Sequence, residues 1–575
     1  MRASSVPNVA LKLPRWRAQL VLFGLLGAFA LMIGRAFYLQ GMNNDFLQAR
    51  GEARFTRVLE IPANRGIITD RDGEPLAIST PVESVWASPE DVKMTEPQAA
   101  ALARLLDMDV PALKKRINES NRDFVFLKRQ MPPDQAARVL ALKIPGVLLQ
   151  REYRRYYPAG DVAAHLVGFT NVDDNGQEGI ELAYQDWLSG KPGSRRVIKD
   201  KRGQIIEDIE SLRVPQQGRD LALSIDRKIQ YLAFRELKNA VVTHRAKAGS
   251  AVVIDVVTGE VLALVNLPAY NPNNRGKLSG QQTRNRAIID LYEPGSTMKA
   301  FTVAAGIEAG VVRPDTVIQT APGSMTIGPN TIRDAHPLGA LTVTQILQKS
   351  SNIGAAKIAL QMPPLQLWQS FSDAGFGVPT RIGFPGEGHG RLRSPKNWRP
   401  IEQATMSYGH GLSVTLLQIA RAYSIFATDG QMRPISIVRV DTPPAPVRVI
   451  SADTAMAVRR MLELATQPGG TAPRAQVAGY RVGGKTGTAH KLDNGVYVDR
   501  YIASFIGFAP ASAPRVIVAV MIDEPSAGQY YGGQVAAPVF SQIVAGALRM
   551  LGVPHDAPVN NIVLPPPGSE VKEEV

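Results

Sequence analysis

The feature that most constrains this 575-residue chain is an uncharged apolar segment close to its N-terminus. Residues 18–34 contain no charged side chain, and the apolar pattern continues past Arg35 to residue 39. About 20 such residues are enough to cross the ~30 Å hydrocarbon core of a membrane. Four basic residues and no acidic residue precede the segment, a bias that retains a short tail in the cytoplasm. The sequence therefore predicts a cytoplasmic tail at 1–17, a transmembrane helix at 18–39 and a large external region.

A cleaved signal peptide is the alternative interpretation of this segment. Its Ala28-Phe29-Ala30 triplet has the small-residue spacing of a cleavage site. The triplet lies inside the apolar run, however, because Leu31-Met32-Ile33 still follow it. A signal peptide ends its apolar region before the cleavage site, so the sequence favours an uncleaved anchor.

Composition excludes several classes of site. Without cysteine the chain can form neither a disulfide framework nor a thiolate zinc site. Its seven histidines are scattered singly, without metal-ligand spacing, and we expect no metal and no other cofactor. The net charge of +14 suits a solvated arginine-rich surface, anionic lipid headgroups or an acidic polymer. The sequence contains no basic stripe interleaved with aromatic residues and no nucleic-acid motif, which argues against nucleic-acid binding.

The chain is too long for one hydrophobic core, so we expect two folded regions after the anchor. Residues 40–230 mix short strand patterns with a helical segment at 97–118 and a hairpin signal at Asp72-Gly73. Residues 154–158 have the character of a surface turn. This region shows no combination of nucleophile, base or metal ligands, and we interpret it as a non-catalytic structural or docking module.

The order of predicted elements in residues 231–555 indicates a second domain, in which strand patterns lie at both ends and helical patterns lie between them. Helical patterns occupy 296–310, 342–361 and 411–428, and strand patterns occupy 250–265, 501–508 and 516–522. The last strand is apolar on both faces, as expected of a central strand. This order predicts an α+β domain with one sheet built from both ends of the domain and helices packed on it. Residues 556–575 are polar and proline-rich, which predicts a disordered tail.

The first chemical motif is Ser296-Thr297-Met298-Lys299, which follows Pro294-Gly295 and precedes an apolar run. These neighbours predict the first turn of a buried helix, where residues i and i+3 share a face. A serine hydroxyl is a good nucleophile only when a base removes its proton. Lys299 can be that base if burial, a nearby cation and the helix N-terminus keep its amine neutral. The spacing alone is weak, because Ser569-Glu570-Val571-Lys572 in the predicted tail also matches it.

Two further motifs make the pattern specific. Ser350-Ser351-Asn352 lies between two helical patterns, and its hydroxyl and amide groups can relay a proton and bind a substrate amide. Lys485-Thr486-Gly487-Thr488 lies in a glycine-rich strand pattern, whose edge can bind an extended peptide through main-chain hydrogen bonds. Three motifs in this order, each in a fitting local context, form a strong joint signal.

These are the three motifs of penicillin-binding proteins and serine β-lactamases. The resemblance extends from the anchor to about residue 545, through RGIITDRDGEPLA, RRYYPAGDVAAHLVGF, GQEGIE, YGHGLSVTLLQIARAY and YIASFIGFAP. The chain is similar to class B penicillin-binding proteins, and most of all to the division-specific transpeptidases of Gram-negative bacteria. This resemblance implies a penicillin-binding transpeptidase fold, with an antiparallel sheet of about five strands flanked by helices. It also implies an elongated mixed α/β module of the dimerisation type before that domain.

The resemblance implies catalytic roles as well. Ser296 is expected to attack the bond between the two terminal D-alanines of a peptidoglycan stem peptide. Lys299 would be the base for acylation, and Ser350 would pass protons toward the leaving amine. Backbone N–H groups of Ser296 and Thr488 would form an oxyanion hole. β-Lactams would acylate Ser296, because they mimic the D-Ala-D-Ala bond.

Other motif residues are expected to bind the substrate. Asn352 would hold a substrate amide, and Lys485 and Thr488 would bind the terminal carboxylate, with Thr486 and Gly487 in support. The residues expected beside the cleft are Tyr408, Gly409 and His410, and those expected on its rim are Tyr530, Tyr531, Gly532 and Gly533. The resemblance further implies a single-pass protein of the bacterial inner membrane with its catalytic domain in the periplasm, at the division septum. Its partners would be a polytopic lipid II polymerase and other divisome proteins.

Several alternatives share parts of this pattern. A β-lactamase needs a group that activates water, and no Glu-x-x-Leu-Asn signature lies between Ser350 and Lys485. A bifunctional synthase needs a glycosyltransferase, and residues 40–230 lack its paired carboxylates. A D,D-carboxypeptidase differs only in the acceptor, and an elongation-specific transpeptidase shares the same motifs, so both remain open. A non-catalytic division scaffold or β-lactam sensor is disfavoured because all the motif side chains are present.

Overall fold

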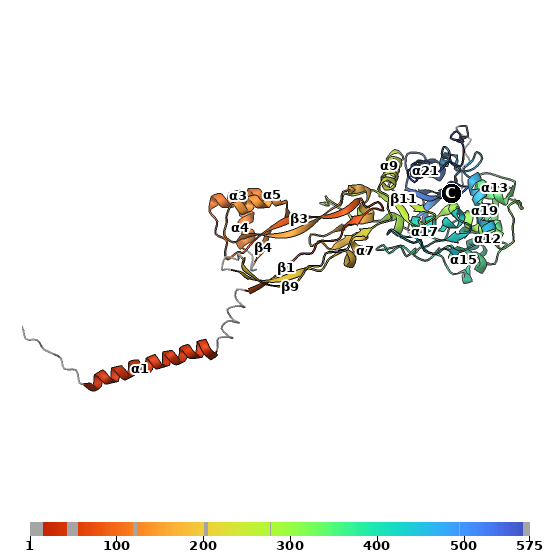
Figure 1. Ribbon diagram of the computed structural model, residues 1–575. Coiled ribbons are helices and arrows are strands. Elements are labelled where there is room, and N and C mark those ends of the chain that lie inside the picture. The colour runs from red at the N-terminus through yellow and green to blue at the C-terminus, as the bar shows by residue number, and fades with distance from the viewer. Residues whose placement is uncertain are drawn as a thin grey trace, which may run out of the picture. The chain divides into compact units, whose positions relative to one another are not determined.

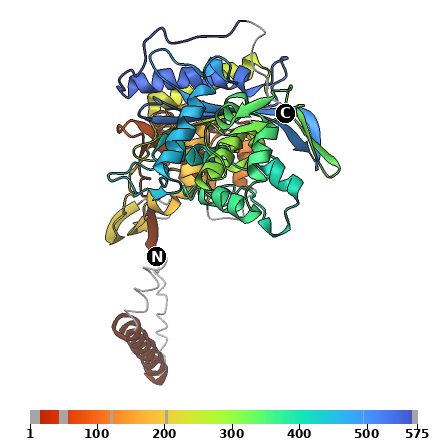
Figure 2. The ribbon, with the colours of Figure 1, turned by 90° about the vertical axis from the view of Figure 1, so that its right-hand side faces the viewer.

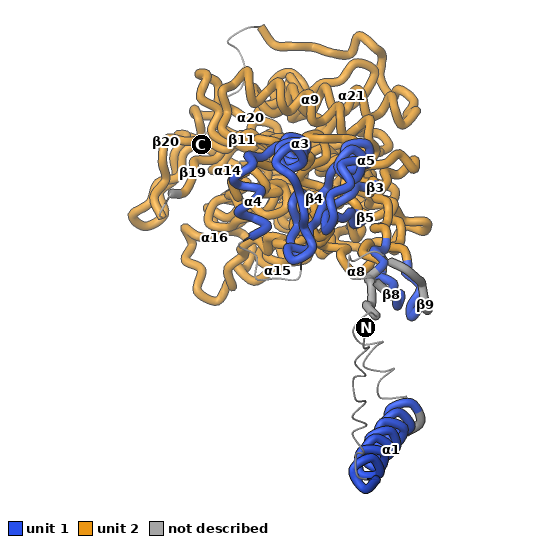
Figure 3. The backbone as a smooth tube through the Cα atoms, turned by 90° about the vertical axis from the view of Figure 1, so that its left-hand side faces the viewer, with its two compact units in different colours: residues 1–63, 81–152, 191–216 blue, residues 64–80, 153–190, 217–575 orange. Residues whose placement is uncertain are grey.

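The computed structural model describes residues 15–42, 56–118, 124–199, 205–276, 278–493 and 495–566. The second Ser-x-x-Lys match at Ser569 lies outside these residues. The chain divides into two compact units (Figure 3), and each unit is described by itself below. Unit 1 contains Met1–Ala63, Pro81–Glu152 and Lys191–Gln216, and unit 2 contains Asn64–Thr80, Tyr153–Gly190 and Gln217–Val575.

Helix α1 (Arg15–Phe37) corresponds to the predicted apolar segment, and a π-helical turn (Tyr38–Met42) follows it. The span Arg15–Gln40 has 26 residues, which corresponds to about 39 Å of helix. By length and composition it can cross a membrane. No residue of α1 is buried by the rest of the protein, as expected of a helix whose surroundings are lipid.

The remainder of unit 1 combines two sheets with three helices. Strands β1 (Thr56–Ile61), β8 (Gly193–Lys199) and β9 (Ile205–Arg213) form an antiparallel sheet. The second half of β3 (Pro75–Ala87) pairs with β4 (Val125–Met131). The predicted helical segment at 97–118 forms two helices, α3 (Glu96–Leu106) and α4 (Val110–Asn118), which pack with α5 (Pro133–Ala141) around one apolar cluster.

Local sequence explains why the helical segment is divided. Thr95 and Gln98 form a reciprocal capping box that begins α3. Asp107 ends this helix because its backbone adopts the left-handed conformation, with φ of 56°. The helical pattern is therefore interrupted at residues 107–109, and the sequence pattern alone did not reveal this break.

The N-terminal part of unit 2 contains the predicted hairpin. Strand β2 (Ile68–Thr69) pairs with the start of β3, and the Asp70 carboxylate accepts hydrogen bonds from the backbone N–H groups of Asp72 and Glu74. Strand β10 (Leu221–Ala222) runs parallel to β2. The short elements that follow in this part are η2 (Gly160–Val162), α6 (Ala164–Val167), β6 (Phe169–Thr170), β7 (Gly176–Glu178), α7 (Gly179–Ala183) and α8 (Gln185–Leu188).

The expectation of a surface turn at residues 154–158 was only partly right. Strand β5 (Val147–Tyr156) extends into this segment, the turn begins at Pro158, and Arg155 is buried. The Nε groups of Arg155 and Arg65 each donate to the buried Glu181 carboxylate at 2.6 Å. Charged side chains can be buried when they are paired in this way, and the partners here lie too far apart in the sequence for the pairing to be predicted.

The principal sheet of unit 2 has five antiparallel strands in the order β12-β11-β21-β20-β19. Of these, β11 is labelled in Figure 1. The strands are β11 (Ala248–Asp255), β12 (Val261–Leu267), β19 (Gly483–Asp493), β20 (Val496–Ala509) and β21 (Val516–Asp523). The sheet therefore combines strands from both ends of the domain, and β21 is its central strand, as predicted. Strand β19, which carries the Lys485 motif, lies at one edge.

Side-chain alternation gives this sheet two apolar faces. Val516, Val518 and Val520 of β21 pack in one cluster with α9 (Arg227–Thr243) and α21 (Ala537–Met550). The alternate side chains Ile517, Ala519 and Met521 join a second cluster with the helices of the opposite face. In Figure 2 the blue helix α21 lies along one side of the domain, and Figure 1 shows α12 and α17 on the other side of the sheet.

The remaining elements of unit 2 lie between β12 and α21 in the sequence. The helical elements are α10 (Gly280–Thr283), α11 (Arg286–Ile289), η3 (Gly295–Met298), α12 (Lys299–Glu308), α13 (Val343–Lys349), α14 (Asn352–Ala359), α15 (Pro364–Asp373), η4 (Pro395–Asn397), α16 (Pro400–Met406), α17 (Leu416–Ala422), α18 (Ser424–Ala427), α19 (Ala452–Leu464), η5 (Pro473–Ala475) and α20 (Gly532–Val535). The short strands are β13 (Val317–Gln319), β14 (Ser324–Ile327), β15 (Asn330–Arg333), β16 (Ala340–Thr342), β17 (Gln431–Met432) and β18 (Val447–Arg448).

The segment predicted as a disordered tail begins with residues that have a defined place. The Asp556 carboxylate accepts a hydrogen bond from the backbone N–H of Arg481, and Val563 exchanges two hydrogen bonds with the Gln476 amide. These contacts tie residues 556–566 to the rest of unit 2. Residues 567–575 lie outside the described part of the chain.

Candidate active site

Ser296 lies in a tight turn directly before a buried helix. Gly295 has φ of 56°, a conformation that glycine adopts without strain, and it begins the 3₁₀ turn η3. Helix α12 continues from this turn at Lys299 and is buried along most of its length. The neighbouring Thr297 is fixed because its carbonyl accepts a hydrogen bond from the Tyr423 hydroxyl at 2.9 Å. The sequence predicted the first turn of an α-helix here, whereas the structure has a 3₁₀ turn that places Ser296 just ahead of the helix.

The Lys299 amine lies at the centre of the site. Its Nζ contacts the Ser296 hydroxyl at 2.9 Å, the Ser350 hydroxyl at 2.9 Å and the Ser350 carbonyl at 2.6 Å. The Lys299 side chain is completely buried, and Ser296 is only 4% exposed. The structure therefore brings together three residues that the sequence placed in two separate motifs.

Ser350 owes its position to the junction of two helices. It ends α13 in the left-handed conformation, with φ of 62°, and Ser351 caps the start of α14. The carboxylate of Asp334 accepts hydrogen bonds from the Ser351 hydroxyl at 2.7 Å and from the backbone N–H of Asn352 at 2.6 Å. The Asn352 amide itself donates to the Arg333 carbonyl at 3.1 Å. This junction points the Ser350 hydroxyl and carbonyl toward Lys299.

Strand β19 brings the third motif against the nucleophile turn. A Cβ atom added to Gly487 would lie 2.8 Å from the Pro294 carbonyl oxygen, so only glycine permits this approach. A Cβ atom on Gly295 would in turn lie 3.3 Å from the Thr488 carbonyl oxygen. The backbones of Gly295 and Thr488 are therefore neighbours. Their proximity brings the Ser296 motif beside the Lys485 motif.

The polar side chains of β19 form a compact network. The Lys485 amine is completely buried and donates to the Thr486 hydroxyl at 3.0 Å and to the Thr471 hydroxyl at 3.4 Å. The hydroxyls of Thr471 and Thr486 lie 2.8 Å apart. On the same face of the strand as Thr486, the Thr488 hydroxyl accepts a hydrogen bond from the backbone N–H of Gly532 at 3.0 Å.

The Tyr408-Gly409-His410 segment supports the nucleophile turn from behind. Gly409 has φ of 91°, its carbonyl accepts a hydrogen bond from Gly295 N–H at 3.3 Å, and an added Cβ would lie 2.1 Å from the Gly295 oxygen. The backbones are therefore too close for any side chain at this position. Burial is the main reason why the pKa of His410 is lowered from its usual 6.5 to about 4.

Next to this segment, Glu293 links the nucleophile turn to the β19–β20 hairpin. Its carboxylate accepts hydrogen bonds from the backbone N–H of Gly411 at 2.8 Å and from the Tyr497 hydroxyl at 2.9 Å. Burial raises the pKa of Glu293, although these two hydrogen bonds oppose the shift. Tyr530, two residues before Gly532, stacks on Tyr501 of β20 with ring centroids 4.1 Å apart.

Three residues of this site were missed from the sequence. Asp334 orients the Ser351 junction, Thr471 contacts the Lys485 network, and Glu293 tethers the loop that follows Gly409. Thr471 and Asp334 lie in loops without a recognisable motif, so no sequence signal identified them. Glu293 lies three residues before Ser296, and this proximity was the one sequence signal that could have identified it as a site residue.

Comparison with known proteins identifies the family. Residues 249–545 match the model of the penicillin binding protein transpeptidase domain, and residues 60–223 match that of the penicillin-binding protein dimerisation domain. The chain belongs to the penicillin-binding protein transpeptidase family. Both the predicted transpeptidase fold and the predicted dimerisation-type module before it are thereby confirmed.

Individual relatives agree with this assignment. This penicillin-binding protein is 43% identical to the probable peptidoglycan D,D-transpeptidase PenA of Neisseria gonorrhoeae, over 94% of each chain. It is 44% identical to the peptidoglycan D,D-transpeptidase FtsI of Escherichia coli strain K12, over 94% of this chain and 93% of the relative. The solved transpeptidase domain of penicillin-binding protein 3 from Burkholderia pseudomallei is 50% identical and covers 58% of this chain and 98% of its own, with a TM-score of 0.55.

Proposed function

We propose that this penicillin-binding protein is a serine-type peptidoglycan D,D-transpeptidase whose nucleophile is Ser296. The observation that carries the proposal is the Lys299 amine, which contacts the hydroxyls of Ser296 and Ser350 at 2.9 Å each. Because the amine is completely buried, desolvation favours its neutral form. A neutral amine at hydrogen-bond distance from a hydroxyl can remove its proton. The activity named for the relatives supports the same reaction.

In the acylation step, the side chains of Ser296, Lys299 and Ser350 carry out all the proton transfers. Lys299 takes the proton from the Ser296 hydroxyl as the Ser296 oxygen bonds to the carbonyl carbon between the two terminal D-alanines of a stem peptide. The carbon–nitrogen bond breaks, and Ser350 passes a proton from the Lys299 amine to the departing amine of D-alanine. The product is an ester between the stem peptide and Ser296.

The cross-link forms when an acceptor amine replaces D-alanine. An amine of a neighbouring stem peptide attacks the ester carbonyl, a new carbon–nitrogen bond forms and the bond to the Ser296 oxygen breaks. Lys299 accepts the proton released by the attacking amine, and a proton returns to the Ser296 oxygen. Both half-reactions therefore use the same base.

Recognition of the stem peptide is assigned to the edge of β19 and to Asn352. Lys485 supplies N–H donors next to the Thr486 hydroxyl, and the Thr488 hydroxyl lies two residues beyond Thr486 on the same face of the strand, which suits a terminal carboxylate. The N–H groups of Ser296 and Thr488 would stabilise the oxyanion, each by roughly 3 kcal/mol of the barrier. Asn352 would bind a peptide amide through the part of its side chain that Arg333 does not engage.

Neighbouring residues hold these side chains in place. We propose that Gly487 allows strand β19 to approach the nucleophile turn closely, and that Gly409 supports the same turn from the other side. Tyr408 packs against His410 with ring centroids 5.3 Å apart, and we assign it to the wall of the cleft. Thr471 is a positioning residue, because it acts through Lys485 and Thr486.

We further propose that α1 anchors the enzyme in the inner membrane with the catalytic domain in the periplasm at the division septum. The charge bias before the apolar segment supports the orientation, and the resemblance of the sequence to division-specific transpeptidases supports the septum. A polytopic lipid II polymerase and other divisome proteins are the partners that this placement suggests. They would bind through α1 and the module between residues 40 and 230.

Acylation of the full-length protein in detergent tests the proposed activity. Fluorescent penicillin should label the protein rapidly and persistently, and mass spectrometry of the digest should place the label on Ser296. Rapid loss of the label would favour a β-lactamase, and absence of labelling would favour a scaffold. Incubation with a D-Ala-D-Ala pentapeptide and an amine acceptor separates a transpeptidase from a carboxypeptidase, because a carboxypeptidase would release D-alanine without forming the cross-linked product.

A further inference from the structure

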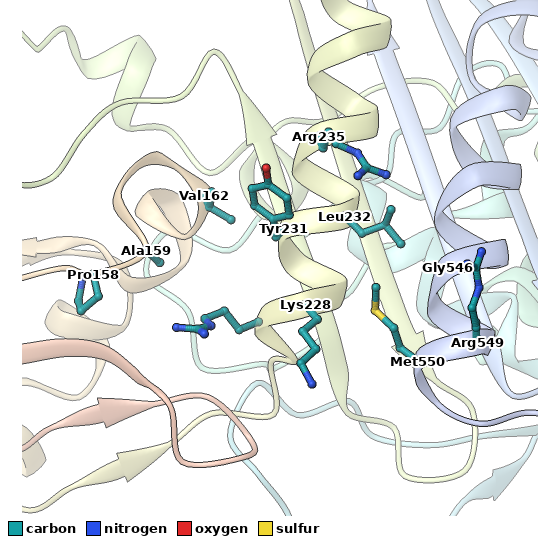
Figure 4. Close-up of a pocket in the computed structure, with 11 residues that line it drawn as sticks. Pro158, Ala159, Val162, Lys228, Tyr231, Leu232, Arg235, Gly546, Arg549 and Met550 are labelled. Atoms are coloured by element: carbon teal, nitrogen blue, oxygen red, sulfur yellow. The ribbon is translucent and has the colours of Figure 1, made fainter.

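A groove lies on the face of unit 2 that is covered by α9 and α21, across the sheet from the Ser296 cluster (Figure 4). We call it the α9–α21 groove, and its volume is about 690 Å³. Residues of the first turns of α9, the last turns of α21 and the turn that leads into η2 line it. The site described above uses none of these residues.

The floor of the groove is apolar and its rim is exposed. Leu232 is buried between the two helices, whereas Tyr231 and Met550 are 56% and 47% exposed. Figure 4 shows Leu232 and Met550 pointing toward each other across the groove. Large apolar side chains that stay exposed on either side of a buried leucine indicate a surface that another apolar group can cover.

The charge of the groove is positive. Arg227, Lys228, Arg235 and Arg549 line it, and no acidic residue is among the lining side chains. Arg227 and Arg235 pair with Glu74 and Glu236, which lie outside the groove. Within the described part of the chain, neither Lys228 nor Arg549 makes an ion pair, so each of the two helices contributes one uncompensated cation to the groove.

The spacing of the rim residues on α9 is regular. Arg227, Tyr231 and Arg235 are four residues apart, so they form a stripe along one face of the helix with steps of about 6 Å. A site for a single phosphate group requires cations that converge on one point. The cations here are instead spread along a helix on either side of an aromatic ring. They suit an elongated ligand with negative groups at intervals on either side of an apolar anchor.

From this pattern we infer that the α9–α21 groove docks an acidic helical segment of a partner protein. The segment would place one apolar side chain between Tyr231 and Met550, over Leu232, and acidic side chains four residues before and after it against the basic rim. Because the partner's helix would have the same rise per turn as α9, its acidic and apolar side chains can be spaced to match the stripe of Arg227, Tyr231 and Arg235. Tyrosine, methionine and arginine are also the residues enriched at protein interfaces. This interaction is separate from catalysis and does not depend on the roles assigned to Ser296 or Lys299.

Site-specific photocrosslinking in the native host tests the docking. The full-length protein carries p-benzoylphenylalanine in place of Tyr231, and a second version carries it in place of Val242, which is 69% exposed at the far end of the same helix. Mass spectrometry of the crosslinked peptide identifies the captured segment. We expect a protein segment with the acid–apolar–acid pattern to crosslink at position 231 and not at position 242. A lipid, a glycan, a segment without acidic residues, or equal crosslinking at both positions would overturn the inference.

Charge reversal supplies the second, independent measurement. The double variant Lys228→Glu/Arg549→Glu should reduce the crosslink at position 231 about tenfold or more, because like charges would face the acidic segment. Lys238→Glu reverses an exposed charge on α9 outside the groove and should leave the crosslink unchanged. Unchanged penicillin labelling and thermal unfolding in both variants would establish that the fold is intact. Replacing an acidic residue of the captured segment by lysine should restore the crosslink, and a crosslink insensitive to these reversals would overturn the inference.

Discussion

The amine of Lys299 lies 2.9 Å from the hydroxyl oxygen of Ser296, and both side chains are buried. Two consecutive turns, η3 and α12, fix this distance, because the residues are three positions apart on a continuous helical path. Proton transfer between them therefore requires no large movement of the backbone. This relationship leads directly to the first two predictions.

Ser296→Ala should fold like the parent protein and lose acylation. The change removes one hydrogen bond to Lys299, whose amine keeps its contacts with Ser350, so the stability cost should be about 1 kcal/mol. Acylation by fluorescent penicillin should fall at least about 10⁴-fold, because the bond-forming oxygen is absent. Gel fluorescence and thermal unfolding measure the two quantities. Labelling at the parent rate would show that another residue is the nucleophile.

Lys299→Arg should lose nearly all acylation, although arginine also carries N–H donors at the end of a long side chain. Guanidinium cannot be deprotonated in a protein and therefore cannot act as the base, so a loss of about 10²- to 10⁴-fold is expected. Arginine is also larger than lysine, and Lys299→Met, which fills a similar volume, serves as a second variant in case Lys299→Arg does not fold. Stopped-flow labelling of folded protein gives the rate. A rate equal to that of the parent in either variant would remove Lys299 from the mechanism.

The sequence identified most of this arrangement because each motif is local. Ser296 and Lys299 are one turn apart, Ser350 lies at a helix boundary with recognisable signals, and the glycines around Lys485 mark a closely packed strand. The sheet could also be predicted, since strand patterns at both ends of a domain have few other ways to bury their apolar faces. In each of these cases the decisive information lies within a few neighbouring residues.

The features that were missed depend on contacts between distant segments. Thr471 meets Lys485 only because a loop before β19 folds back beside the strand, and Asp334 reaches Ser351 from a hairpin. Arg155 was predicted on the surface because a charged residue is normally exposed, and its buried partner Glu181 lies 26 residues away. Such pairings are set by tertiary structure, which local patterns do not encode.

Thr471→Val should slow acylation without unfolding the domain. Its hydroxyl contacts both Thr486 and Lys485, so its loss should weaken the binding of a carboxylate more than the chemical step. We expect acylation at low penicillin concentration to fall about tenfold, while the rate at saturation changes little. Thr471→Ser keeps the hydroxyl and should restore most of the activity.

Thr466→Val is the matched control for this prediction. Thr466 is also buried and donates to the carbonyl oxygens of Glu463 and Val482, away from the Lys485 network. Its replacement should lower the thermal unfolding midpoint but leave acylation at low penicillin concentration close to that of the parent. Equal kinetic effects of the two valine variants would indicate that Thr471 has only a structural role.

Asp334→Asn should disturb the Ser350 junction. The carboxylate accepts three hydrogen bonds, from the Ser351 hydroxyl and the N–H groups of Asn352 and Ile353. An amide provides fewer acceptor sites and no charge, so we expect a loss of about 1–3 kcal/mol in the free energy of unfolding and slower acylation. Ser351→Ala removes only one of the three bonds and should have a smaller effect on both. Denaturant titration and labelling rates check this order, and a larger effect of Ser351→Ala would contradict it.

Stability should decline in acid partly because of His410. Its pKa is lowered to about 4 in the folded protein, whereas an unfolded histidine binds a proton near 6.5. Between these values the unfolded state binds more protons, so the free energy of unfolding should decrease as the pH falls from about 6.5 to about 4 and level off outside that window. A shift of this size corresponds to about 3 kcal/mol. Denaturant titrations at pH 7.5 and pH 4 measure how much unfolding free energy each protein loses in acid. This loss should be smaller in His410→Gln than in the parent by about that amount. In His336→Gln, where the histidine is exposed, the loss should equal that of the parent. Equal acid sensitivity of His410→Gln and the parent protein would show that His410 is not held neutral by its surroundings.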